Sequence, residues 1–394
     1  MSRWTYDCSM TGPGTLAGRF LRRFWQPVTK IDDIGIGQTR PLRIMSEDFT
    51  LYRGASGKCF VIAPRCAHRG SQLSTGWVEG DDIRCRYHGW KFTGAGQCVE
   101  QPAERERQFC DKVKIAHYPT VDYKGLVFAY LGDGEPPVFP IFPELEGDGV
   151  LETISYRRNC NLTNVLDNQL DEAHFPFAHR RGSDGFGEMP TIRVKRTEYG
   201  VAGYCERAGS NPRVTEFMMP NILRLKMLSC NAVPIPGNGV AWRVPIDDAS
   251  QYTFGINYYA VAKEDKLRIA EEQQRINNLP RPPWLELTEA VLAGKMTVEE
   301  VEANLGEHNP IQNVHFEDHV VMQAQGVVAD RDREILGSSD LGIRAIRDLW
   351  NEALAAFAKD GTVNNEIIPP PTLVAGAPAT ALNIVSDPSS LQLA

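Results

Sequence analysis

Between about residue 41 and residue 132 the sequence alternates short runs of β-forming residues with glycine-containing turn signals. The clearest runs cover residues 49–53, 59–63, 113–116 and 126–131. This spacing predicts a small antiparallel β domain. Upstream, a Gly/Pro loop at residues 12–18 leads into a short amphipathic helix, and the Gly- and Pro-rich residues 132–143 predict the linker that ends the domain.

The second part of the chain mixes strand and helix periodicities. Strand patterns cover residues 151–158, 192–198 and 252–261, and a helical stretch covers residues 161–179. Residues 264–305 are helical and polar with a proline-rich break at 279–283, and two further helices are predicted at 311–325 and 343–359. The pattern predicts an α+β protein with an N-terminal domain in residues 1–140 and a second domain in residues 150–365. Its Pro-, Ala- and Ser-rich tail, residues 366–394, is expected to be extended or poorly ordered.

The composition is ordinary for a globular protein, with 42% apolar and 23% charged residues. The net charge of −8 argues against a nucleic acid partner, because phosphate binding needs clustered Lys and Arg. No stretch approaches about eighteen apolar residues, and the N-terminus has no apolar signal region, so we expect neither a membrane span nor secretion. Most of the nine cysteines form no short-spaced set, which favours a reducing cytoplasm over a disulfide framework.

The most specific motif consists of two Cys-His pairs, Cys66-Ala-His68 and Cys85-Arg-Tyr-His88, separated by sixteen residues. A tetrahedral zinc site can also use two Cys and two His, but it usually pairs Cys with Cys and His with His. Here each segment offers one of each, so the thiolates can bind one iron of a [2Fe–2S] cluster and the imidazoles the other, as in a Rieske centre. Gly70 and Gly89 follow the two His, where each loop must turn around the cluster.

A second concentration of ligands lies at residues 167–179. Asp167, Asp171 and His174 follow steps of four and three residues, so a helix would place them on one face. His179 would lie about 140° from that face on an ideal helix, but Pro176 breaks the helix and lets both His rings converge on one ion. The alternative is a polar helix face with solvated His. For Asp167, an ion pair with a nearby Arg is at least as good an interpretation as a catalytic role.

Asp318 is the third candidate ligand. It lies within the apolar stripe of the helix at 311–325, which consists of Ile311, Val314, Val321 and Met322. A carboxylate on a buried stripe is costly unless it is paired or bound to a metal. Glu317 and His319 point about 100° to either side and are expected to be exposed, whereas His315, about 60° away, competes for the third-ligand role. Two His and one carboxylate form the facial triad of non-haem Fe(II) sites.

The Rieske motif followed by D-N-x-x-D-x-x-H-x-x-x-x-H at residues 167–179 resembles the oxygenase (alpha) subunit of the Rieske non-haem iron oxygenases. Residues 11–15, 21–27, 317–318 and 336–340 are similar to its phthalate dioxygenase-like branch. The resemblance implies that the cluster is bound by Cys66, His68, Cys85 and His88. It also implies iron ligation by His174, His179 and Asp318, with Asp171 as the bridging acid and Asn168 as a near-ligand.

The resemblance further implies a Rieske β domain followed by a catalytic domain in which an antiparallel sheet, surrounded by helices, holds the iron. The implied activity is O₂-dependent oxygenation of an aromatic substrate, by a ring-hydroxylating dioxygenase acting on an aromatic carboxylate or phenoxy-type compound. The alternative within the family is an aryl-ether O-demethylase or monooxygenase. The rival from another class is a Rieske electron-transfer protein, which needs only a small domain and no second metal site.

The family assembles as head-to-tail trimers or dimers of trimers, because the cluster and the iron of one chain lie too far apart for fast electron transfer. Asp171 would then accept hydrogen bonds from His174 and from His88 of a neighbouring subunit. No dinucleotide-binding fingerprint is found, so electrons are expected from a separate NAD(P)H-dependent reductase, with or without a ferredoxin.

An aromatic carboxylate as substrate would require a cationic anchor, preferably Arg, in the region 181–260. The candidates on strand-like runs or directly behind His179 are Arg180, Arg181, Arg193, Arg196, Arg207, Arg224 and Arg243. We expect one or two of them to reach the substrate pocket and the others to lie at the surface or in subunit contacts.

Overall fold

The computed structural model describes residues 4–104, 108–180, 187–207, 213–227, 237–306, 311–366 and 392–393. The chain divides into two compact units. The N-terminal unit comprises Met10–Phe139 and Val244–Asp248, and the C-terminal unit comprises Met1–Ser9, Pro140–Arg243 and Ala249–Ala394. Residues 4–9, expected in the N-terminal domain, group instead with the C-terminal unit, where the Thr5 N–H donates to Asn351 Oδ1 at 2.7 Å.

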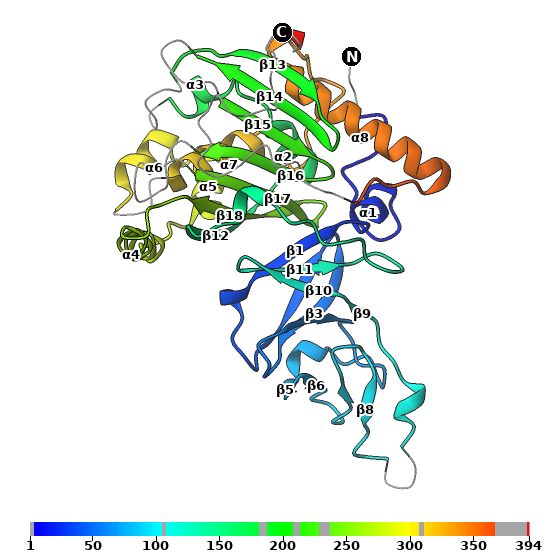
Figure 1. Ribbon diagram of the computed structural model, residues 1–394. Helices are drawn as coiled ribbons and strands as arrows, with labels where there is room; N and C mark the ends of the chain where they lie inside the picture. Colours follow the sequence, from blue (N-terminus) through cyan, green and yellow to red (C-terminus); the bar gives the residue numbers. More distant parts are fainter. Residues whose placement is uncertain are drawn as a thin grey trace. The chain divides into compact units, whose positions relative to one another are not determined.

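Short β-strands are the main regular elements of the N-terminal unit, as predicted (Figure 1). Its helix α1 covers Leu16–Leu21, and its strands are β1 (Trp25–Lys30), β2 (Thr39–Ile44), β3 (Glu47–Arg53), β4 (Cys59–Ile62), β5 (Trp77–Glu79), β6 (Asp82–Arg84), β7 (Lys91–Phe92), β8 (Cys98–Glu100), β9 (His117–Tyr118), β10 (Thr120–Tyr123) and β11 (Leu126–Tyr130). Among the described residues they form three sheets, β1-β11-β10, β2-β3-β4-β9 and β5-β6-β7-β8. The strand pairs in these sheets are antiparallel.

Residues 113–116, predicted as a strand, contribute only an isolated bridge between Lys114 and Gln97. A 3-10 turn, η3 (Cys110–Lys112), directly precedes them, and the Val113 N–H still donates to the Cys110 carbonyl at 3.0 Å. The turn therefore leaves too few extended residues to continue a ladder.

A large antiparallel sheet forms the centre of the C-terminal unit. Within the described residues its strand order is β12-β18-β17-β16-β15-β14-β13-β19. The strands are β12 (Val150–Arg158), β13 (Thr191–Arg196), β14 (Gly200–Glu206), β15 (Arg213–Met218), β16 (Ile222–Met227), β17 (Gly237–Asp247), β18 (Ser250–Tyr259) and β19 (Gln392–Leu393). Of the tail expected to be extended or poorly ordered, the structure describes only Glu366 and residues 392–393, and the latter pair with β13.

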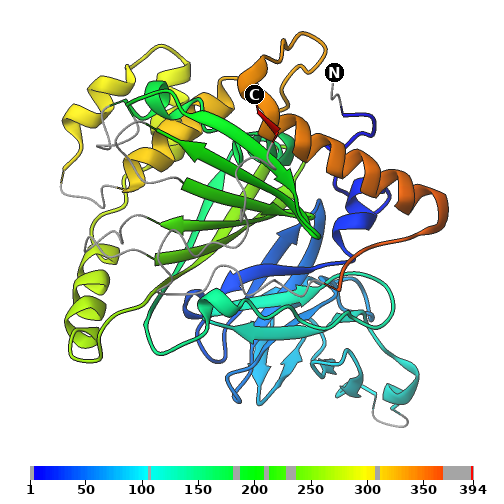
Figure 2. The same cartoon turned by 45° about the horizontal axis from the view of Figure 1, so that its top comes forward.

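Helices accompany this sheet, as Figure 2 shows for the same unit. They are α2 (Leu162–Asn168), α3 (Phe175–Ala178), α4 (Lys266–Asn277), α5 (Trp284–Leu292), α6 (Val298–Asn304), α7 (Ile311–Gln323) and α8 (Leu341–Asp360). Helix α8 packs beside β13, β14 and α2, whereas α7 contacts α2, α3 and α5. The contacts of α7 bring it to the segment that carries the two candidate His ligands.

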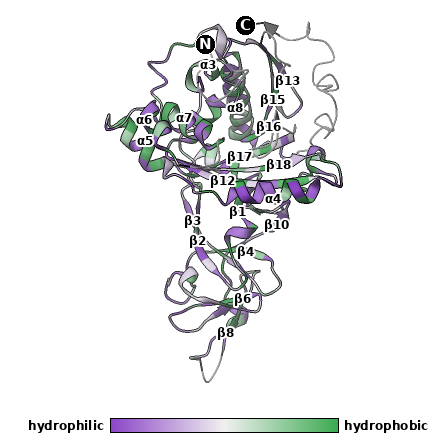
Figure 3. Cartoon of the chain, turned by 90° about the vertical axis from the view of Figure 1, so that its left-hand side faces the viewer, coloured by the Kyte–Doolittle hydropathy of each residue, from purple (hydrophilic) through white to green (hydrophobic). Residues whose placement is uncertain are grey.

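The predicted break at 279–283 separates α4 from α5. Figure 3 colours most of α4 as hydrophilic, and its buried residues Ile269, Gln273 and Ile276 share one side at helical spacing. Among the described residues, no helix has both the length and the apolar character that a membrane crossing requires.

Candidate metal centres

Two loops of the N-terminal unit repeat one backbone pattern. In each, the Cys N–H donates to the carbonyl five residues further on, at 2.8 Å for Cys66 and 2.9 Å for Cys85. Each Cys carbonyl accepts from the glycine N–H four residues on, at 2.9 Å from Gly70 and 3.0 Å from Gly89. The two glycines have φ of 71° and 75°, a left-handed conformation that Gly adopts without strain. The predicted role of both glycines as turn residues is therefore confirmed.

The four side chains of the Cys-His motif lie on these loops. Cys66 and Cys85 are buried, and the ring centroids of His68 and His88 are 4.5 Å apart. Burial raises the pKa of the Cys66 thiol to about 11, so a bound metal is needed to keep it as a thiolate. His68 Nδ1 is buried without a hydrogen-bond partner, and the ring stacks on Trp90 at 4.6 Å. Two buried thiols beside two imidazoles fit a cluster held by two Cys and two His.

In the C-terminal unit, the helix predicted at 161–179 ends earlier than expected. Helix α2 stops at Asn168, and α3 begins only at Phe175, so Asp171 and His174 lie in the turn between them. The Asp171 side chain accepts a hydrogen bond from the Ala173 N–H at 3.1 Å, a local contact that competes with helix formation. Pro176 lies in the first turn of α3, where its missing N–H costs no hydrogen bond. The prediction that Asp167, Asp171 and His174 share one helix face was therefore wrong.

The two His side chains nevertheless converge with Asp318 of α7. Asp318 Oδ1 lies 3.6 Å from His174 Nε2 and 3.3 Å from His179 Nε2. One candidate ligand atom from each of the three residues lies within 4.8 Å of the others. His179 Nε2 and Asp318 Oδ1 are buried without hydrogen-bond partners. Such orphaned atoms facing one another fit a bound cation. His315, the competing candidate, instead stacks on Tyr156 at 4.3 Å.

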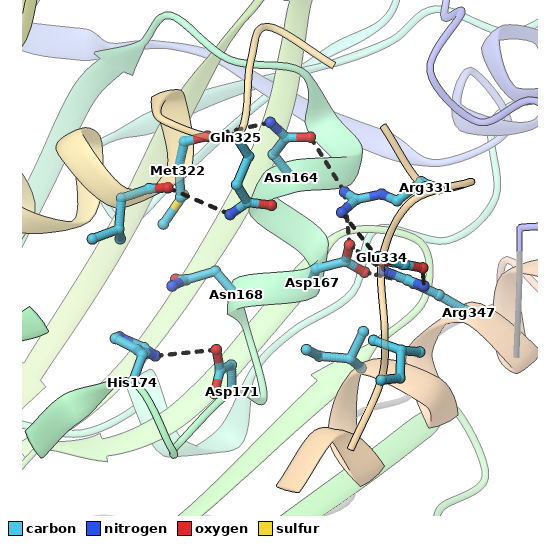
Figure 4. A pocket seen from close by; sticks show the side chains of 13 residues that line it. Asn164, Asp167, Asn168, Asp171, His174, Met322, Gln325, Arg331, Glu334 and Arg347 are labelled. Atoms are coloured by element: carbon cyan, nitrogen blue, oxygen red, sulfur yellow. Dashed lines mark hydrogen bonds and ion pairs between the residues drawn. The ribbon is translucent and has the colours of Figure 1, made fainter. Parts of the chain in front are cut away.

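Carboxylates hold the far sides of both imidazoles. His179 Nδ1 lies 2.7 Å from Glu317 Oε2. His174 Nδ1 lies 3.6 Å from Asp171 Oδ2, as Figure 4 shows. Burial opposes protonation of His174, but its contacts with Asp171 and Asp318 raise its pKa to about 10. These carboxylates thus favour positive charge at the imidazoles, and positive charge is also what a metal cation would supply. Carboxylates behind metal-binding imidazoles orient the rings and increase their basicity.

Two exposure predictions for α7 were wrong. Glu317 and His319, expected at the surface, are both 4% exposed, whereas Val321 of the predicted apolar stripe is 36% exposed. The single-stripe model fails because α7 packs against α2, α3 and α5 and so buries more than one side. A buried Glu needs a partner, which His179 supplies.

Sequence reasoning also missed Arg158 at the end of β12. Its Nη2 donates to Asp318 Oδ2 at 3.3 Å and to the Tyr156 hydroxyl at 3.4 Å. Burial lowers the pKa of His319 to about 2, with Arg158 and His315 adding to the effect, so the imidazole is neutral. The sequence did indicate that Tyr156 and Arg158 lie on the same side of one strand. It did not indicate that this strand, β12, lies next to α7, so the contact of Arg158 with Asp318 could not be predicted.

The arginines proposed as substrate anchors have different environments. Arg224 and Arg207 are buried in ion pairs with Glu144, Glu216 and Glu172. Arg196, Arg193 and Arg180 pair with Glu352, Glu206 and Glu299. Arg181 lies outside the described residues. Arg243 differs, because its Nε donates to Gln169 Oε1 at 2.9 Å; burial lowers its pKa, and the neighbouring Tyr156 and Asp318 oppose this effect. Among the candidates that the structure describes, Arg243 is thus the one that has no carboxylate partner, and Asp318 is near enough to influence its pKa.

A cavity of about 230 Å³ lies beside His174 (Figure 4). Asn168, Asp171 and His174 line one part of it, and Asp167 lies in another. Asp167 Oδ2 pairs with Arg347 at 2.8 Å and with Arg331 at 2.7 Å. The interpretation of Asp167 as an ion-paired acid is confirmed. The residues that line this cavity all lie outside the span 181–260, in which we expected the substrate pocket.

Residues 24–119 match the family described as the Rieske [2Fe-2S] domain. The 5,5'-dehydrodivanillate O-demethylase oxygenase subunit of Sphingobium sp. (strain NBRC 103272 / SYK-6) is 29% identical over 92% of this chain and 84% of its own length. The tert-butanol monooxygenase / tert-amyl alcohol desaturase oxygenase subunit of Aquincola tertiaricarbonis is 29% identical over 91% and 80%. The phenoxybenzoate dioxygenase subunit alpha of Ectopseudomonas oleovorans is 32% identical over 61% and 64%. The chain is a homologue of Rieske oxygenase subunits.

The solved structure of NdmA from Pseudomonas putida CBB5 matches with a TM-score of 0.63, over 92% of this chain and 95% of NdmA, at 17% identity. This likeness concerns the fold alone. The predicted resemblance to Rieske oxygenase alpha subunits and the predicted α+β fold are both confirmed. The Rieske domain indicates a [2Fe–2S] cluster.

We expect Glu317→Gln to weaken binding of Fe(II) by the C-terminal unit by about 10-fold or more, because the neutral amide no longer increases the basicity of His179. The measurement is anaerobic competition with a chromogenic chelator. Glu152→Gln is the control, since Glu152 is equally buried but bonds to Asn257 and Gln273. Equal iron affinity in both variants would show that Glu317 does not support the ligand.

Proposed function

We propose that this chain is the terminal oxygenase of an O₂-dependent system in which electrons pass from a Rieske cluster to a mononuclear Fe(II). The observation that carries the proposal is the convergence of His174, His179 and Asp318, with orphaned buried atoms, in a chain that also has a Rieske domain. Cys66, His68, Cys85 and His88 are the proposed cluster ligands. Iron held by two His and one carboxylate has open positions and supplies O₂ activation when it is bound.

Each protein group has a definite task in this proposal. Glu317 accepts a hydrogen bond from the Nδ1 side of His179 and fixes the ring so that Nε2 faces the metal position. Asp171 lines the cavity behind His174, with its Oδ2 3.6 Å from His174 Nδ1, and is the proposed bridging acid toward His88 of a neighbouring subunit. Asn168 lines the same cavity and is the proposed near-ligand.

The proposed reaction is oxygenation of an aromatic substrate, either by ring dihydroxylation or by aryl-ether O-demethylation. The relatives support both, since one is named a phenoxybenzoate dioxygenase and another an O-demethylase. The relative named for tert-butanol extends the range to an aliphatic alcohol. A Rieske electron-transfer protein remains the rival, but it has no use for a second unit with a buried His-His-Asp group.

For partners, we propose a separate NAD(P)H-dependent reductase, with or without a ferredoxin, and assembly as a homotrimer or a dimer of trimers in the cytoplasm. The relatives named as oxygenase subunits support the separate reductase, because that wording implies further components. The cysteine pattern of the sequence supports a reducing compartment.

Arg243 supports an anionic substrate. The residue is only partly exposed, and no carboxylate pairs with it among the residues that the structure describes. Burial lowers the pKa of Arg243, against the opposing effects of Tyr156 and Asp318. An Arg in such a position presents a planar fork that matches a carboxylate. We propose that Arg243 anchors the carboxylate of an aromatic acid.

Iron analysis tests the proposed function. We expect three irons per chain in the wild type and two in His174→Ala, which should keep the visible absorption of the cluster but lose oxygenation. Two irons in the wild type, both lost with the cluster absorption when Cys66 is replaced by Ala, would favour the electron carrier instead.

Asp171→Asn should retain all three irons and lose nearly all turnover with a matched reductase, because the amide is neutral and replaces one of the two acceptor oxygens with an NH₂ donor. Iron content, cluster absorption and product formation are measured together. Asp332→Asn, at an exposed acid of the same unit, is the control. Turnover of Asp171→Asn at the wild-type rate would contradict the bridging role.

Arg243→Gln should weaken binding of an aromatic carboxylate by about 10- to 100-fold, since a hydrogen bond to a charged group contributes about 1.5–3 kcal/mol. The corresponding methyl ester or aryl ether should bind both proteins equally. Affinity is measured calorimetrically, with Arg196→Gln as the control because Arg196 lies in an exposed ion pair with Glu352. Unchanged carboxylate binding would favour a neutral aromatic or aryl-ether substrate.

A further inference from the structure

The guanidinium of Arg158 lies directly behind the candidate ligand Asp318. Arg158 is only 3% exposed, so its positive charge is almost entirely removed from solvent. Nη2 lies 3.3 Å from Asp318 Oδ2, and Nη1 donates to the His315 carbonyl at 3.4 Å. The guanidinium carbon lies 5.1 Å from the centre of the Tyr156 ring. Arg158 is therefore fixed by contacts with both β12 and α7.

The two oxygens of Asp318 have different surroundings. Oδ1 faces His179 Nε2 at 3.3 Å and His174 Nε2 at 3.6 Å and has no hydrogen-bond partner. Oδ2 faces Arg158. One oxygen thus points to the position where the metal would bind, and the other is occupied by a donor from the protein.

We propose that Arg158 is a positioning residue that retains Oδ2, so that Asp318 presents only Oδ1 to the metal. This inference rests on the proposed function, because it assumes a metal at His174, His179 and Asp318. A carboxylate that binds through both oxygens takes two coordination positions, whereas one held by Arg158 takes one. The arrangement keeps a further position open for O₂, water or an oxygen of the substrate.

The chemistry of the side chain explains why Arg suits this task. A guanidinium is planar and permanently charged, and its donors point in fixed directions, so it can contact Asp318, Tyr156 and the His315 carbonyl together. The ammonium group of Lys is a compact charge on a flexible stem and cannot reproduce this set of contacts. Arg158→Lys therefore retains the charge while losing the geometry.

The test uses the holoprotein with its cluster intact and with Co(II) in place of the mononuclear iron. X-ray absorption at the cobalt edge is blind to the cluster iron and reports the distance from cobalt to the Asp318 carboxylate carbon. That distance is short when both oxygens bind and long when one binds. We expect the long distance in the wild type and the short distance in Arg158→Gln and Arg158→Lys. Arg243→Gln, which removes a nearby charge without touching Asp318, should keep the long distance.

Ferrous affinity gives a second readout. We expect Arg158→Gln to bind Fe(II) about 10-fold more weakly than the wild type, because Asp318 loses its orienting contact. Circular dichroism and cluster absorption show whether the variants are folded, and Arg158→Lys serves if Arg158→Gln is not. A short distance in the wild type, or a distance and affinity unaffected in Arg158→Gln and Arg158→Lys, would overturn the inference. Absence of a metal at this site in the wild type would instead overturn the proposed function.

Discussion

The buried charge of Asp318 is the constraint on which the C-terminal unit depends. An ionised carboxylate away from water is costly unless opposite charges or hydrogen-bond donors surround it. Burial alone would raise the pKa of Asp318, but His174, His179 and Arg158 together hold it well below its usual range. Carboxylates stand behind the two imidazoles in turn, so acids and bases alternate from Asp171 through Asp318 to Glu317. In this arrangement the two imidazoles can release their protons when a metal cation binds, because the cation then supplies the positive charge that balances the carboxylates.

The fold produces this alternation from segments that are distant in sequence. The hydrogen bond of Asp171 with the Ala173 N–H helps to form the turn that separates α2 from α3, which lets two His only five residues apart face the same point. Helix α7 then supplies Asp318 and Glu317 as neighbours in sequence that contact different atoms: Asp318 lies near the Nε2 atoms of both His, and Glu317 lies at Nδ1 of His179. Arg158 comes from β12, so the sheet and the helices meet at one carboxylate.

How much the sequence could predict follows from how local each feature is. The Rieske loops were predictable because short spacings and two glycines define them, and their backbone contacts span only four or five residues. The interruption of the helix was predicted at Pro176, but its earlier position was not predictable, since it depends on the Asp171 side chain bonding to the backbone of its own segment. The burial of Glu317 and His319 depends on three helices packing around α7, and Arg158 meets Asp318 across 160 residues of sequence. The pattern of apolar residues along one helix shows neither how many neighbouring helices pack against it nor which distant residue contacts it.

The presence or absence of a balancing carboxylate also distinguishes the arginines that stabilise the fold from those that could act in the site. Arg224 is fully buried, but Glu144 and Glu216 compensate it, and Arg207 has Glu172. Removing either member of such a pair leaves an uncompensated buried charge, so these residues serve stability first. Near the candidate iron ligands the count differs, because Arg158 pairs with Asp318 and the charge of Arg243 lies nearby, while Asp318 is also the proposed ligand of a dication. When that cation is bound, the positive charge exceeds the negative charge on this side of the site. An anionic group of a substrate is the component that would restore the balance.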